Sequence, residues 1–133
     1  MPLIADRNTP LKDGELIPAK VAAGKLIFAG ALVVASSTGF ATPGVTATNV
    51  TYLGRAEEQK DNSGGADGDQ VVMVRRGRAF KFKNAGADLI AQAQFGKPCY
   101  IVDDETVAAT NGTNTRSQAG IVVGIDSDGV WVL

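Results

Sequence analysis

Residues 119–133 constrain the fold more than any other part of the chain, because they form the pattern of two strands joined by a tight turn. An apolar run covers Ile121–Ile125, and a second run, Val130–Leu133, reaches the last residue. Between them, Asp126–Gly129 has the residues of a turn, with a positive φ expected at Gly129. This β-hairpin predicts a compact β domain, and we expect the chain to end within its own fold.

The composition fits many short strands. Hydrophobic residues make up 44% of the 133 residues, but aromatic residues only 6%, so we expect a core of small and β-branched side chains. The 16 glycines are spread along the sequence, which is typical of frequent turns between strands. The chain is long enough for one domain. The fold class that we predict is all-β: a small β-barrel or β-sandwich of short antiparallel strands.

We expect residues 1–15 to form an extended N-terminal arm and residues 16–133 to form a single β domain. The first fifteen residues contain two prolines, mixed charges and the turn Lys12-Asp13-Gly14, without a period of two or 3.6 residues. An extended arm of this length reaches on the order of 50 Å, enough to lie across a neighbouring subunit. The alternative reading is a terminus that is merely disordered.

Three local predictions concern the body of the chain. Pro18 cannot donate to a strand ladder, so its segment is an edge strand or a strand end. Gln70–Arg75 and Arg78–Lys83 form a hairpin around Arg76-Gly77. Residues Ala87–Phe95 have helical spacing over a short stretch and form at most one short helical turn.

The stretch Asp61–Asp69 combines acidic residues with glycines, which suggests a calcium loop at first sight. A calcium loop of this type ends with a glutamate at its twelfth position, which falls here on Val72. We therefore expect a mobile surface loop.

Basic and aromatic residues alternate in the segment Arg75–Lys83. Phe80 and Phe82 share one face of the expected strand, while Lys81 and Lys83 share the other. A barrel that binds single-stranded nucleic acid uses such a strand with its aromatic rings outward, stacked on bases. Because the chain offers few other large residues for a core, we favour inward phenylalanines, with the basic residues facing solvent or a protein partner.

The sequence offers little for catalysis. It lacks histidine, and the acidic groups Asp103–Glu105 and Asp126/Asp128 fall in expected turns, where solvation keeps carboxyl pKa values near normal. The single cysteine, Cys99, lies in an apolar run and is read as a small buried thiol. We therefore expect no enzyme activity, no metal and no cofactor or small-molecule substrate.

The formal net charge of −1 gives no long-range attraction for nucleic acid or an anionic membrane. The N-terminus lacks the pattern of a signal peptide, and no apolar stretch approaches the ~18 residues of a membrane span. We therefore expect neither a nucleic-acid nor a membrane partner, and assembly in a reducing cytoplasm.

Several stretches, in their order and spacing over nearly the whole chain, resemble the structural cement, or capsid decoration, proteins of tailed bacteriophages. They are Ala5–Pro10, Ala29–Val33, Gly54–Glu58, Asp61–Gly65, Gly96–Tyr100 with Asp103-Asp104, and Val123–Asp126. The resemblance implies a small β-rich module, commonly trimeric, that binds the outer surface of an assembled head where major capsid subunits meet. The implied location is the capsid surface of a virion assembled in the host cytoplasm.

On this basis the expected partners are the major capsid protein and further copies of the chain in a homotrimer. The arm residues expected to lie on a capsid subunit or an adjacent protomer are Leu3, Ile4 and Arg7. The candidate polar contacts to an acidic capsid surface are Arg75, Arg76 and Arg78. Two alternatives remain at this point: a tail or head-completion component of a phage, and a small barrel that binds single-stranded nucleic acid.

Overall fold

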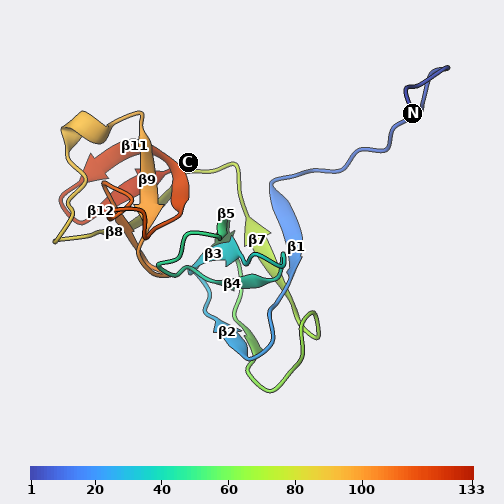
Figure 1. The fold of residues 1–133 in the computed structure, drawn as a ribbon, viewed down its shortest axis with the longest axis horizontal. Coiled ribbons are helices and arrows are strands. Elements are labelled where there is room, and N and C mark those ends of the chain that lie inside the picture. Colours follow the sequence, from blue (N-terminus) through green and yellow to red (C-terminus); the bar gives the residue numbers. More distant parts are fainter.

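A computed structural model describes all 133 residues and shows an all-β protein (Figure 1). The strands of the first half of the chain are β1 (Leu16–Lys20), β2 (Lys25–Ile27), β3 (Leu32–Ala35), β4 (Ala41–Pro43), β5 (Thr51–Ala56), β6 (Lys60–Asn62) and β7 (Val71–Arg75). Those of the second half are β8 (Phe80–Asn84), β9 (Pro98–Ile101), β10 (Thr106–Ala108), β11 (Gln118–Asp126) and β12 (Gly129–Val132). The all-β prediction is confirmed.

The helical content is the single 3₁₀ turn η1 (Gln92–Gln94). It lies inside the segment for which the sequence predicts at most one helical turn, so this prediction is confirmed. No helix in the structure has the length and apolar character needed to cross a membrane.

The first half of the chain forms a five-stranded antiparallel sheet with the order β1-β7-β5-β3-β4, beside the small ribbon β2-β6. β1 is an edge strand, as Pro18 predicts. In β1, the odd-numbered residues form the backbone hydrogen bonds to β7. Because Pro18 is even-numbered, its nitrogen points to the open edge of the sheet, where a missing N–H costs no hydrogen bond between strands. Pro43 takes the matching outward position in the other edge strand, β4. Both edges are therefore poor templates for further strand pairing.

The second half forms a closed barrel with the order β10-β8-β12-β11-β9. Its pairs are antiparallel except for β8 and β10, which run parallel. The predicted C-terminal hairpin is confirmed, with Asp126 opposite Gly129 at its turn. The expected positive φ at Gly129 is wrong. Glycine is required there by space instead, since a Cβ would lie 2.7 Å from Lys81 Cγ and 2.8 Å from the Phe82 carbonyl oxygen.

The predicted hairpin around Arg76-Gly77 is wrong. β7 pairs with β1 and β5 in the sheet, whereas β8 pairs with β12 and β10 in the barrel. The residues between them, 76–79, are the connection between the two halves of the molecule. Alternation along a strand shows which face is buried, but it does not show which strand is the partner.

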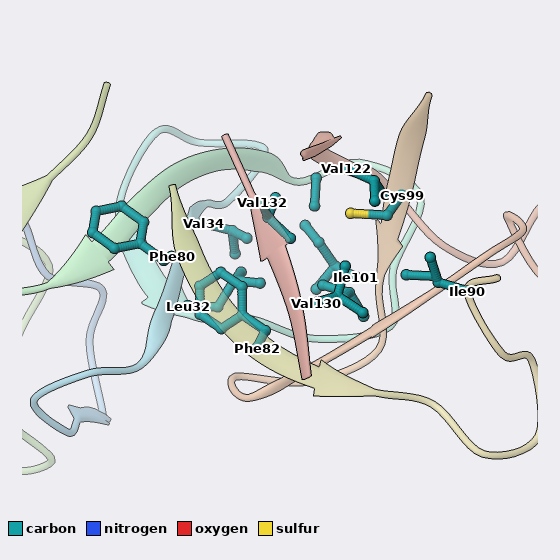
Figure 2. Close-up of a cluster of buried hydrophobic side chains, with 12 residues drawn as sticks. Leu32, Val34, Phe80, Phe82, Ile90, Cys99, Ile101, Val122, Val130 and Val132 are labelled. Atoms are coloured by element: carbon teal, nitrogen blue, oxygen red, sulfur yellow. The ribbon is translucent and has the colours of Figure 1, made fainter. Parts of the chain in front are cut away.

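The core consists of two clusters, and β3 contributes to both. Val33 belongs to the cluster of the sheet, whereas Leu32 and Val34 point into the cluster of the barrel. Figure 2 shows these two β3 side chains among those of the barrel strands. Because successive residues of a strand point to opposite faces, β3 packs against both halves and holds them together.

Three predicted core residues are buried in the barrel cluster. Phe80 and Phe82 are 8% and 5% exposed, and Cys99 is fully buried, which confirms the inward orientation of the phenylalanines and the buried thiol. Burial raises the pKa of the Cys99 thiol to about 12, so the group stays protonated at physiological pH.

The acidic loop Asp61–Asp69 lies largely at the surface, as the sequence predicts, and hydrogen bonds tie it to the rest of the fold. Asn62 is 2% exposed, and its amide nitrogen lies 2.9–3.2 Å from the carbonyl oxygens of Val21, Ala22 and Ala66, which share its two N–H groups. The carboxylates of this loop accept backbone N–H groups, as Asp67 does from Ala23 at 2.7 Å. Their acceptor groups are used to shape the loop.

Candidate functional site

The first candidate surface is the N-terminal arm, whose residues 1–14 are all exposed. Its four large apolar side chains are all exposed: Met1 fully, and Leu3, Ile4 and Leu11 to 72%, 96% and 95%. Arg7 donates from Nη1 to Thr9 Oγ1 at 2.8 Å, and residues 1–14 make no hydrogen bond or ion pair to any residue beyond Glu15. Figure 1 shows the arm running away from β1 into open space. We call residues 1–14 the free arm.

The free arm joins the body beside the arginines that the sequence singled out. The Glu15 carbonyl oxygen accepts from the Arg76 N–H at 2.7 Å, and the Glu15 carboxylate accepts from Arg78 Nη2 at 3.1 Å. Glu15, the last residue of the arm expected from sequence, is therefore already anchored to the body. The structure therefore places the C-terminal end of the arm beside Arg75–Arg78, which we call the arginine turn. It does not bring Leu3, Ile4 or Arg7 close to the arginine turn.

The three candidate arginines differ in whether their guanidinium groups already have a carboxylate partner. Arg75 donates from Nε to Glu57 Oε1 at 3.0 Å, and Arg55 donates to the same oxygen. The hydrogen bond from Arg75 is the main cause that lowers the pKa of the Glu57 carboxyl. Arg78 is held by Glu15, whereas Arg76 is exposed and makes no ion pair. Of the three, Arg76 has the guanidinium group most available to a partner.

A hollow of about 280 Å³ adjoins the arginine turn. It is lined by Tyr52, Leu53, Arg76, Gly77, Arg78, Phe80 and Leu133. Leu53, Phe80 and Leu133 form the apolar part of its lining, and burial raises the pKa of the Tyr52 hydroxyl to about 12. Arg76 therefore lies beside apolar side chains, and a partner that displaces water from them strengthens the electrostatic contacts of Arg76.

A second hollow, of about 440 Å³, lies between the β2–β3 connection and the turn before β10. It is lined by Phe28, Ala29, Gly30, Ala31, Asp104 and Glu105, and we call it the Phe28 hollow. Phe28 is 54% exposed, so its ring is available to a partner. The lining contains two acidic residues and no basic one.

The two acids of the Phe28 hollow are not equivalent. Glu105 pairs with Lys83, at 2.6 Å between oxygen and nitrogen. Asp104 is half-buried and makes no ion pair; burial, followed by the charge of Asp103, raises the pKa of its carboxyl. The sequence interpretation, which gave these turn acids ordinary pKa values, is wrong at Asp104. Sequence reasoning missed this site because its aromatic and acidic parts lie some 75 residues apart in the chain.

No group of three or more Cys, Asp or Glu side chains is arranged to hold a metal ion. No family model, no curated protein and no solved structure matches the chain.

Proposed function

We propose that this protein is a structural component of a tailed-phage virion that binds the outer surface of the assembled head and stabilises contacts between major capsid subunits. Two things support the proposal: the resemblance of the sequence to capsid decoration proteins, and the free arm. The arm is the observation that carries it, because fourteen exposed residues with four large apolar side chains need a partner to be covered.

The free arm and the body have different roles in this proposal. Ordering a backbone costs about 1–2 kcal/mol per residue, so an arm that makes no contact with its own body becomes ordered only where a partner surface covers it. The arm therefore attaches to a capsid subunit or a neighbouring protomer, with Leu3 and Ile4 as apolar anchors and Arg7 as a polar contact. The closely packed β body is the rigid part that spans between subunits. Three arms in a trimer give tight attachment from contacts that are weak individually.

The burial of Phe80 and Phe82 disfavours the alternative of a single-stranded nucleic-acid binder. Such a protein stacks bases on outward aromatic rings, and these two rings are core residues here. The remaining alternative, a tail or head-completion component, differs in copy number: a decoration protein is present in hundreds of copies per virion.

The proposal is tested by deleting residues 1–14 and measuring cosedimentation with phage heads that lack this protein. The deletion stops at Gly14 because Glu15 is bonded to the arginine turn. We expect the truncated protein to keep its fold by circular dichroism and to lose attachment. As a matched control, a glycine-serine segment of the same length replaces the arm, and it should also fail to attach. Undiminished attachment of the truncated protein would refute the role of the arm.

A further inference from the structure

We propose that Arg76 of one copy inserts into the Phe28 hollow of a second copy, where its guanidinium pairs with Asp104 and lies against the Phe28 ring. The inference rests on the proposed function, in which copies of the chain associate, and it names the contact that joins them. It gives Arg76 a partner in a second copy of this chain.

The donating side of this contact is rigid and exposed. Gly77 has a φ of 73°, a left-handed conformation that glycine adopts without strain, and it turns the backbone sharply beside Arg76. The backbone of Arg76 is fixed by the hydrogen bond to Glu15, and the adjacent Arg78 is held by the same residue. Only the Arg76 side chain remains without a partner, beside apolar side chains that include the 53% exposed Leu133. It is therefore presented outward from a fixed position.

The accepting side has what an arginine requires. The exposed Phe28 ring offers a face to a planar cation, an interaction worth about 0.5–2 kcal/mol depending on how much water is removed. Asp104, at the same hollow, is a half-buried carboxylate without an ion-pair partner, and an arginine pairs with a carboxylate through two parallel hydrogen bonds. The small residues Ala29 and Gly30 leave room for the stem of the incoming side chain. The hollow thus combines an aromatic face, an unpaired acid and space.

The two sides are complementary in charge and occupy different places on the molecule. The hollow at the arginine turn contains two basic residues and no acidic one, and the Phe28 hollow contains two acidic residues and no basic one. In Figure 1 the connection from β7 to β8 runs along the top of the body, whereas the connection from β2 to β3 lies lower. A contact between two different patches on identical subunits is head-to-tail, and such contacts build a closed ring, such as a trimer, where the rotation from one copy to the next closes.

The test uses charge reversal on each side, with the full chain and without phage heads. Light scattering should show a trimer for the wild type, whereas Arg76→Glu and Asp104→Arg should each weaken self-association by about 30-fold or more, the effect of breaking a desolvated charge pair. Lys97→Glu is the matched control, because Lys97 is exposed, makes no ion pair and lies in neither hollow; it should leave the trimer unchanged.

A double variant distinguishes this contact from mere misfolding. Arg76→Glu and Asp104→Arg in the same chain place complementary reversed charges at every head-to-tail contact of a ring, so the double variant should associate again. A wild type that is monomeric at high concentration, single variants that associate normally, or a double variant that stays dissociated would overturn the inference. A variant that self-associates normally but no longer binds heads would also overturn it, and would place the capsid in the hollow. Since head binding through the arm is measured separately, failure of this contact leaves the proposed function standing.

Discussion

Replacing Leu3 and Ile4 together by serine should weaken attachment to heads without affecting the fold. Burying a large aliphatic side chain completely contributes about 1.5–3 kcal/mol. Since Leu3 and Ile4 are 72% and 96% exposed in the free protein, nearly all of this gain is still available to a partner. After a loss of about 0.5–1 kcal/mol in rotamer freedom for each side chain, the net contribution is about 2–3 kcal/mol per protomer. This corresponds to about 30–150-fold in the affinity of one arm.

The assay is a titration of heads that lack the protein, with the bound copies per head quantified after pelleting. The melting temperature of the double variant should equal that of the wild type, because neither side chain contacts the body. The matched control is Leu89→Ser, which removes a 60% exposed leucine from the body and should leave attachment unchanged. Attachment of the double variant within about threefold of the wild type would refute the reasoning, because the anchors would then contribute less than about 0.7 kcal/mol.

Two further predictions concern the body. Asn62→Ala removes an amide whose two N–H groups are shared by the carbonyl oxygens of Val21, Ala22 and Ala66. It should destabilise the protein by about 2–3 kcal/mol and lower the melting temperature by about 6–15 °C. The matched control is Asn49→Ala, which removes an exposed amide and should change the melting temperature little; equal melting temperatures for both variants would disprove the structural role of Asn62. Because burial raises the pKa of Cys99 to about 12, its thiol should resist labelling by a maleimide at pH 8 until denaturant is added. Mass spectrometry of the chain before and after denaturation measures the labelling, and rapid labelling of the native protein would contradict this prediction.

The features predicted correctly from the sequence are those that depend on local pattern. The alternation of Phe80 and Phe82 with lysines identified the buried face of β8, and the missing N–H of Pro18 identified an edge strand. The turn residues after Ile125 identified the last hairpin. Each of these follows from a constraint that acts within a few residues.

The features that the sequence did not predict depend on contacts between distant segments. β7 and β8 are neighbours in sequence but find their partners at a distance, in β1 and β12. The polar stretch around Asn62 gives no sign that its amide is buried against the carbonyl oxygen of Val21, 41 residues away. The Phe28 hollow likewise forms only when the β2–β3 connection meets the turn that contains Asp104.

The most direct test of the central claim is a density map of the virion that carries this chain, at a resolution that allows side chains to be traced. The proposal predicts that the β body occupies the outer surface of the head in hundreds of copies, with residues 1–14 ordered against an adjacent subunit. A shell without this chain, or one in which the body is present and the arm projects freely into solvent, would contradict it.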